Sequence, residues 1–412
     1  MTGGIGADPL AGLREGAARA KRGALGLADR PPVYAQISHH SARLAGASTV
    51  EFFRDAKTFL RSELTADLFY GIDGPTIHYD VYNIEAEALG ARLLWDEGQV
   101  PAVDPRRPLL DSPAAHERLR PPKPGQAGRM PYALEINARL QDLGLEPKVR
   151  FTGPISLAAA LLGLEGLMLA IQTEPDRVHA LMRFLTREVV APWIACQREG
   201  CGGRLTATGS DALASPPLLG VEQVREFCLG YIQELERLAG GIRLAGLWGE
   251  SCVPEPRQLL DIKAAGSPAS IQVLDPDVTA LGPAYFRAYA REKDLSLVMG
   301  LDANLVGAGD LEHIRARARR FIEEGGRDGR FVLFINDVPF DSAPERVRAV
   351  VSTACEYRAD PGVSAYVRGT AGREPPWPTL EQARFAVDQC LGPSPAQGPA
   401  GYSGGRPAAS RS

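Results

Sequence analysis

Short apolar runs rich in β-branched and aromatic residues alternate with amphipathic helical stretches along most of this chain. Several runs are followed by Gly, Pro or Asp, which is typical of buried parallel strands. Helical stretches such as residues 50–64 and 221–238 lie between them. We expect strands at residues 33–37, 67–70, 148–152, 204–208, 242–248, 270–274, 295–299 and 331–335. Eight strand–helix alternations predict an α/β fold, a (β/α)8 TIM barrel.

An open, doubly wound sheet is the competing interpretation of the same alternation. No Gly-rich phosphate loop follows the first expected strand, which argues against a nucleotide-binding sheet. The chain divides into an N-terminal extension at residues 1–27 and a single barrel domain at 28–390. An inserted segment at about 91–145 follows the second strand. Residues 391–412 are rich in Gly, Pro, Ser and Ala, so we expect a disordered tail.

Composition excludes several classes of partner. The net charge of -4 gives no basic surface for nucleic acid. The most apolar stretch, residues 155–171, is interrupted by Glu165 and is too short to span a membrane. The first ten residues lack the layout of a signal peptide. The six cysteines form no CxxC pair, which fits a reducing compartment, and we expect a cytoplasmic protein.

Barrel enzymes place their functional groups after the strands, and polar residues stand there in this chain. His39 and His40 follow the first strand, where either could transfer protons near neutral pH, or could bind a metal. Side chains expected to bind substrate follow the second, fifth, seventh and last strands. They are Asp73, His78, Tyr79, Trp248, Asp302 and Asn336. A structural role is an equally good interpretation for several of them, and turn capping is favoured for Asp302.

Several motifs, in this order, resemble the uroporphyrinogen decarboxylase (URO-D) superfamily. The segment Phe151-Thr-Gly-Pro-Ile-Ser-Leu-Ala158 is similar to a stretch of that family, and Leu164-Glu-Gly-Leu-Met168 continues it. Gly300-Leu-Asp302 resembles a family turn, and residues 332–347 resemble its closing strand and helix. The pattern is most similar to the cobalamin- or corrinoid-dependent methyltransferase branch. This resemblance implies the barrel fold.

The resemblance also carries expectations about the site. The loop at residues 36–43 lacks the arginine pair with which the decarboxylases grip a porphyrin, so uroporphyrinogen is not the expected substrate. At the positions of the thiol methyltransferases' zinc ligands stand Glu250, Cys252 and Asp337. The resemblance thus implies a metal site, with zinc as the expected cofactor. Asp211 stands where the family keeps an acidic residue after the fourth strand, and we expect it to be catalytic.

These observations predict a metal-dependent methyltransferase. It would move a methyl group between a small molecule and a corrinoid or thiol acceptor, with a corrinoid carrier protein as a candidate partner. The first alternative is a decarboxylase or other lyase acting on a small carboxylic acid, with protons delivered by His39, His40 and Asp211. The second alternative is a barrel without catalysis that serves as a binding subunit.

Overall fold

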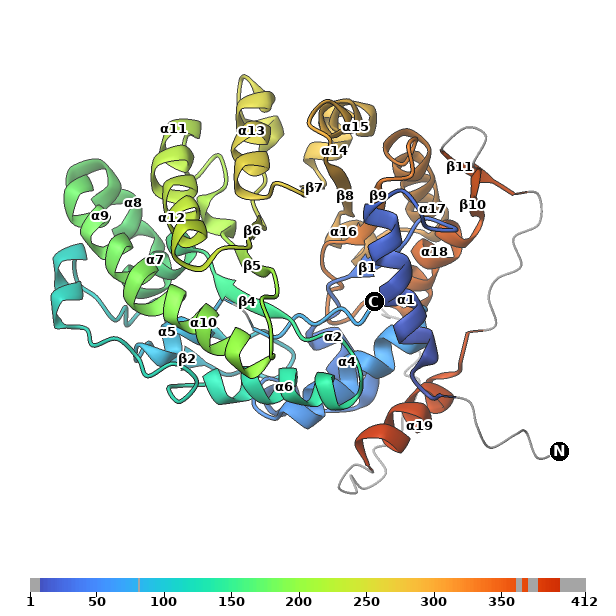
Figure 1. The fold of residues 1–412 in the computed structure, drawn as a ribbon, viewed down its shortest axis with the longest axis horizontal. Coiled ribbons are helices and arrows are strands. Elements are labelled where there is room, and N and C mark those ends of the chain that lie inside the picture. Colours follow the sequence, from blue (N-terminus) through green and yellow to red (C-terminus); the bar gives the residue numbers. More distant parts are fainter. Residues whose placement is uncertain (1–7, 81, 361–364, 370–376, 393–412) are drawn as a thin grey trace, which may run out of the picture.

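The computed structural model describes residues 8–80, 82–360, 365–369 and 377–392. Two parallel sheets form its centre, and helices cover their outer faces (Figure 1). One sheet has the order β1–β9–β8–β7 and the other the order β4–β5–β6. The strands are β1 (Val33–Ala35), β4 (Val149–Thr152), β5 (Ala207–Ser210), β6 (Ile242–Ala245), β7 (Ser270–Leu274), β8 (Ser296–Leu301) and β9 (Phe331–Ile335).

The α/β architecture with parallel strands is confirmed. The first strand, β1, pairs in parallel with the last, β9, through Val33–Leu333 and its neighbours, as it would in a ring. Strand pairing is interrupted at two places among the described residues, between β1 and β4 and between β6 and β7. The fold is therefore consistent with a TIM barrel, but a closed ring of eight hydrogen-bonded strands is not shown.

The prediction of a strand at residues 67–70 is wrong. These residues form the last turn of α4 (Ala56–Tyr70), which Asp55 caps and which ends at Gly71 with a φ of 68°. Residues 72–80, named the second segment below, instead follow α4 and begin beside β1, where Asp73 N donates to Val33 O at 2.9 Å. A four-residue apolar run fits a buried helix as well as a strand, so its pattern could not separate the two.

The other elements follow the predicted alternation. The π-helical segments Leu185–Val190, Val224–Leu229 and Phe321–Gly325 continue α9, α11 and α17. Two short antiparallel pairs lie outside the centre, β2 (Leu93–Leu94) with β3 (Ala102–Val103) and β10 (Tyr357–Asp360) with β11 (Ala365–Arg368).

The helices are α1 (Ala11–Ala24), α2 (His39–Ala45), α3 (Thr49–Phe52), α4, α5 (Ile84–Ala88), α6 (Met130–Asp142), α7 (Pro154–Leu162), α8 (Leu164–Thr173), α9 (Pro175–Phe184), α10 (Ala191–Gly200), α11 (Val221–Gln223), α12 (Gly230–Ala239), α13 (Pro256–Gly266), α14 (Asp277–Leu281), α15 (Pro283–Glu292), α16 (Ala303–Ala308), α17 (Leu311–Arg320), α18 (Pro344–Cys355) and α19 (Leu380–Leu391).

Helix α1 packs across the N-terminal ends of the strands. Its Leu13 is buried, and its Gly23 lies against Pro32 and the carbonyl of Phe331, at the start of β9. Figure 1 views the molecule from this side, with α1 in front of β1 and β9. The expected tail falls mainly on residues 393–412, which lie outside the described residues, and α19 ends at Leu391.

In the described part of the chain, no single helix is long and apolar enough to cross a bilayer. Helices α7 and α8 meet the length and composition test only as a pair bent by 108°.

Candidate functional site

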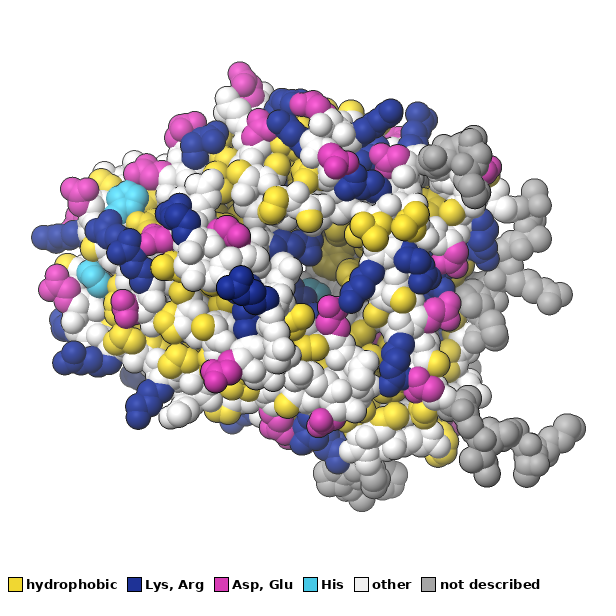
Figure 2. All heavy atoms as spheres, viewed as in Figure 1, with side chains coloured by type: hydrophobic (Ala, Val, Ile, Leu, Met, Phe, Trp, Pro, Cys, Tyr) yellow, Lys and Arg dark blue, Asp and Glu magenta, His cyan; other side chains and the backbone are white. Residues whose placement is uncertain are grey.

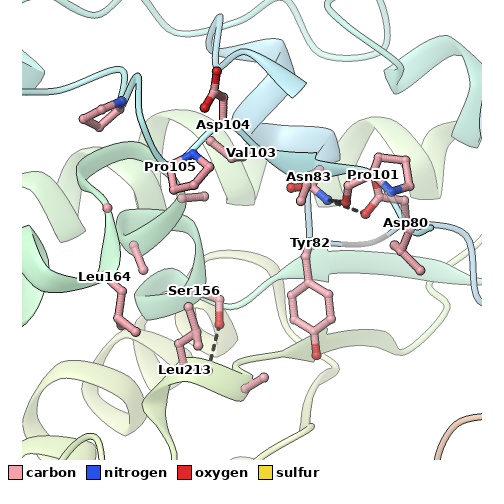
Figure 3. Close-up of a pocket in the computed structure, with 17 residues that line it drawn as sticks. Asp80, Tyr82, Asn83, Pro101, Val103, Asp104, Pro105, Ser156, Leu164 and Leu213 are labelled. Carbon is pink, nitrogen blue, oxygen red and sulfur yellow. Dashed lines mark hydrogen bonds between the residues drawn. The ribbon is translucent and has the colours of Figure 1, made fainter. Parts of the chain in front are cut away.

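A cavity of about 390 Å³ lies just beyond the C-terminal ends of β4 and β5 (Figure 3). Its walls come from segments far apart in the sequence. They are residues 80–83, the inserted segment around 100–108, helix α7 with Gly163 and Leu164, and Ala212 with Leu213 after β5. Parallel α/β folds bind their ligands at this end of the strands. The cavity is therefore the best candidate for the active site.

The cavity is mainly apolar, with a few polar groups at defined places. Val100, Val103, Ala159, Leu164 and several prolines and alanines form most of the wall. The polar residues are Asp80, Tyr82, Asn83, Asp104 and Ser156. A wall of this kind suits a small molecule that is mostly apolar and is held through one or two heteroatoms.

Tyr82 stands just before α5, and its side chain points toward β5. Its hydroxyl forms a hydrogen bond with Oγ of Ser210, the last residue of β5. Burial raises the pKa of the Tyr82 phenol, and the negative charge of Asp211 raises it further. The phenol is therefore protonated at neutral pH and can donate a hydrogen bond.

Asn83 holds one wall of the cavity in place. Its Nδ2 donates to Asp80 Oδ1 at 2.6 Å and to the carbonyl of Pro101 at 2.8 Å, as Figure 3 shows. Asp80 is buried and also accepts from Arg129 at 2.5 Å. The inserted segment is thus tied to residues 80–83 by a network of buried polar contacts.

Asp211 lies behind the cavity wall. Its two carboxylate oxygens accept from the backbone N–H of Ile155 at 3.2 Å and of Ser156 at 2.7 Å, in the first turn of α7. The side chain is fully buried, and a Cβ at Gly153 would come within 2.3 Å of it. These contacts are those of a helix cap. Asp211 thus positions α7 and Ser156, and the catalytic role predicted for it has no support from these contacts.

The two histidines after β1 have different surroundings. Both ring nitrogens of His40 are engaged, with the carbonyl of Phe340 at 3.0 Å and with Tyr70 Oη at 2.7 Å, and burial lowers its pKa to about 4. His39 stacks on the ring of Phe340, and its buried Nδ1 has no hydrogen-bond partner in the part of the chain that the structure describes. The preceding Ser38 has a φ of 49°, unusual for a residue other than glycine. Of the two histidines, His39 is the better candidate for a role in chemistry.

The three predicted metal ligands do not form a metal centre. Glu250 is fully buried and paired with Lys263, whereas Cys252, two residues later, is exposed. Asp337 follows β9 and is partly buried, and burial raises its pKa to about 6. Across the described ranges, no three His, Cys, Asp or Glu side chains are placed so that they could hold one ion. The residues therefore do not fit the expected zinc ion.

Asp73 lies at the N-terminal end of β1, whereas the cavity lies beyond the C-terminal ends of β4 and β5. Its carboxylate accepts from Arg19 at 2.7 Å, from Arg30 at 2.8 Å and from the backbone N–H of Val33 at 2.8 Å. Asp73 was expected to follow a strand at residues 67–70. Because those residues are helical, Asp73 instead begins the second segment, residues 72–80. Asp73 thus anchors the N-terminal helix, and the substrate-binding role predicted for it does not fit this position.

The remaining predicted residues are spread around the strand ends. Tyr79 lies in the core, where its hydroxyl donates to Gln197 Oε1 at 3.4 Å. Asp302 caps α16 by accepting from the N–H of Asn304 at 2.9 Å, as favoured from the sequence. Three others are partly buried and do not line the cavity, namely His78, Trp248 and Asn336.

Sequence reasoning missed Tyr82, which lines the cavity, and Ser210, which holds the Tyr82 hydroxyl by a hydrogen bond. Tyr82 was missed because the second strand was predicted at residues 67–70, too far from Tyr82 to place it at a strand end. The signal that could have identified it is the group of polar residues Asp80, Tyr82 and Asn83. Ser210 directly precedes Asp211, so only its neighbour was singled out.

Comparisons with known proteins agree with this architecture. The sequence model of the uroporphyrinogen decarboxylase (URO-D) family matches residues 18–357. A methylated-thiol–coenzyme M methyltransferase from Methanosarcina mazei is 26% identical over 284 residues, which cover 65% of this chain and 71% of that protein. The solved structure of a methyltransferase from Methanosarcina mazei superposes with a TM-score of 0.66 at 18% identity. That match covers 81% of this chain and 97% of the solved one, and it shows a shared fold.

Proposed function

The chain belongs to the uroporphyrinogen decarboxylase family, and on that premise we propose that it is a methyltransferase whose small-molecule substrate binds in the cavity beside Tyr82. The relative named above acts on a methylated thiol. The observation that carries the proposal is the cavity itself. It is an apolar space at the C-terminal ends of β4 and β5, with one protonated phenol held at its wall. An apolar wall suits a methyl group, and a phenol suits the heteroatom that bears it.

The proposed transfer is a displacement at the methyl carbon. A bond forms between the acceptor and the methyl carbon while the bond from that carbon to the donor heteroatom breaks. The heteroatom leaves with the bonding electron pair. The hydroxyl of Ser210 can donate to the phenolic oxygen of Tyr82, which leaves the phenol hydrogen free to stabilise the departing heteroatom.

The acceptor is proposed as a thiol or as a corrinoid carried by a partner protein. The cavity volume of about 390 Å³ lies at the lower end of small-molecule pockets, so a corrinoid ring would stay outside it, on its carrier. Because the described residues do not fit a zinc ion, no step of this proposal depends on a metal.

The proposal is tested by assaying the full chain with methyl donors of three kinds, namely methyl thioethers, methylamines and methyl ethers. Cob(I)alamin serves as the corrinoid acceptor, followed by its absorbance, and coenzyme M serves as the thiol acceptor, followed by mass spectrometry. We expect methylation of at least one acceptor. Failure with every donor, or release of CO2 from small carboxylic acids in place of methyl transfer, would overturn the proposal.

A matched pair of variants links any activity to the cavity. Tyr82→Phe removes the hydroxyl at the wall, while Tyr285→Phe removes a phenol from α15 on the surface. We expect Tyr82→Phe to lower the turnover rate and Tyr285→Phe to leave it unchanged. Equal rates for both variants would place the reaction elsewhere.

A further inference from the structure

Two arginines share one row on the inner face of the β4–β5–β6 sheet. Arg150 is paired in register with Thr208, and Thr208 with Arg243, so the three side chains project from the same face. Their neighbours along the strands, such as Phe151 and Leu244, belong to the hydrophobic core on the outer face. Arg150 and Arg243 therefore point into the space between the two sheets.

Tyr34 faces the same space from β1. Its neighbours Val33 and Ala35 pack into the core on the outer side of their own sheet, which turns Tyr34 inward. Burial raises the pKa of the Tyr34 phenol to about 12, and the negative charges of Asp73 and Glu146 add to this rise, while the positive charges of Arg243 and Arg150 oppose it. The phenol thus lies close enough to both guanidinium groups for their positive charges to lower its pKa.

Neither arginine has an acidic partner among the described residues. Arg243 makes no hydrogen bond or ion pair there, and Arg150 makes one long side-chain contact, from Nη2 to the carbonyl of Ile77 at 3.4 Å. The Nε atoms of both arginines are buried and have no hydrogen-bond partner within the described ranges. Burial lowers the pKa of both groups, and the charge of Arg150 lowers that of Arg243 further. Two unpaired, desolvated charges of the same sign are costly unless a counter-charge binds.

The two side chains also keep some accessible surface. Arg150, Arg243 and Tyr34 are all partly exposed although burial shifts their pKa values, which is the behaviour of groups that line an internal space. Figure 2 shows a hollow near the centre of the N-terminal face, between α1 and the strands β4–β6, with basic side chains beside it. A ligand could therefore enter from the end opposite to the candidate active site.

We propose that this space binds a small molecule through an oxyanion, a carboxylate or a phosphate, held between Arg150 and Arg243. Guanidinium groups present a planar fork that matches such an anion in two-point contacts. The hydroxyls of Tyr34 and Thr208 face the same space and supply further donors. None of these four residues lines the cavity beside Tyr82, so the anion-binding proposal is tested independently of the methyl-transfer proposal.

The test measures binding of inorganic phosphate and of succinate to the full chain by calorimetry and by thermal denaturation. We expect at least one of the two to bind and to raise the melting temperature, and the one that binds tighter identifies the anion class. Arg243→Met should weaken this binding at least tenfold, as should Arg150→Met. The matched control is Arg237→Met, because Arg237 is exposed on α12.

A second readout separates lost binding from lost folding. Without added anion, Arg243→Met should melt at or above the wild-type temperature, because it removes a desolvated charge that has no acidic partner among the described residues. Arg243→Lys keeps the charge but not the fork, and should also bind at least tenfold more weakly. The proposal is overturned if neither anion stabilises the wild type, or if Arg243→Met and Arg243→Lys bind within twofold of it.

Discussion

The hydroxyl of Tyr82 forms a hydrogen bond with Oγ of Ser210, although the two residues are 128 positions apart in the sequence. Tyr82 follows the second segment, residues 72–80, and Ser210 is the last residue of β5. The hydrogen bond therefore joins one wall of the cavity to the C-terminal end of β5. The position of the phenol, and with it the proposed chemistry, depends on this contact.

A double-mutant cycle measures the strength of that contact. Tyr82→Phe and Ser210→Ala each remove one hydroxyl of the pair. We expect the two changes in the free energy of unfolding to be non-additive by about 1 kcal/mol, the usual net value of a hydrogen bond. Chemical denaturation of the four proteins gives the value. Strict additivity would show that the two hydroxyls do not interact in solution.

Replacing Asp73 should affect stability and leave substrate binding intact. Asp73→Asn removes a buried negative charge that pairs with Arg19 and Arg30. Loss of one partner of a buried ion pair costs about 3 kcal/mol, which we expect in the free energy of unfolding. The substrate KM should not change, because Asp73 lies at the far end of the strands. A raised KM with normal stability would restore the substrate-binding role predicted from the sequence.

Glu85 should make stability depend on pH. It is fully buried beside Thr152, and burial raises its pKa to about 7 from an ordinary value of 4.5. Between these values the folded chain holds a proton that the unfolded chain has released, so the free energy of unfolding falls as the pH rises from 4.5 to 7. The contribution is on the order of 3 kcal/mol.

Glu85→Gln should remove the contribution of Glu85 to this slope. Part of the slope should remain, because the pKa of Asp67 is also raised to about 7. Glu165→Gln, on the exposed side of α8, is the matched control and should leave the slope unchanged. Denaturation at several pH values measures both. Identical slopes for Glu85→Gln and the wild type would mean that Glu85 is ionised throughout.

Lys263 should stabilise the fold by neutralising the buried carboxylate of Glu250. The two form a buried ion pair, and burial raises the pKa of Glu250 to about 7 although Lys263 opposes the rise. Lys263→Met leaves the carboxylate unpaired and should destabilise the fold by about 3–5 kcal/mol. The double variant Glu250→Gln/Lys263→Met should recover part of this loss. If Glu250 instead held a metal, the double variant would lose that ion, and elemental measurement would show the change.

Much of the fold could be predicted from the sequence because most of the strands lie in apolar runs of their own, with β5 (Ala-Thr-Gly-Ser) as an exception. The runs around Val149, Ile271 and Phe331 became strands within a residue or two of the expected places. The second segment, residues 72–80, could not be identified from an apolar run. Residues 72–80 carry Asp73, a Gly–Pro pair and His78, so they lack the apolar pattern of a strand even though they lie beside β1.

The site was predicted less well, because side-chain direction depends on the fold and not on spacing. Glu250 and Cys252 stand two positions apart and were expected to face one pocket, but the chain forms a 3₁₀ turn that buries one and exposes the other. Asp211 was placed correctly at a strand end. Whether it faced a ligand or a helix end depended on α7, whose first turn supplies its two N–H partners.

The most direct test of the proposed function is the steady-state rate of methyl transfer by Tyr82→Phe beside the wild type. The phenol is proposed to act on the departing heteroatom, so its loss should lower kcat by about 10² while KM stays nearly the same. An unchanged kcat in a variant that folds normally would contradict the assignment of the cavity beside Tyr82 as the site of the reaction.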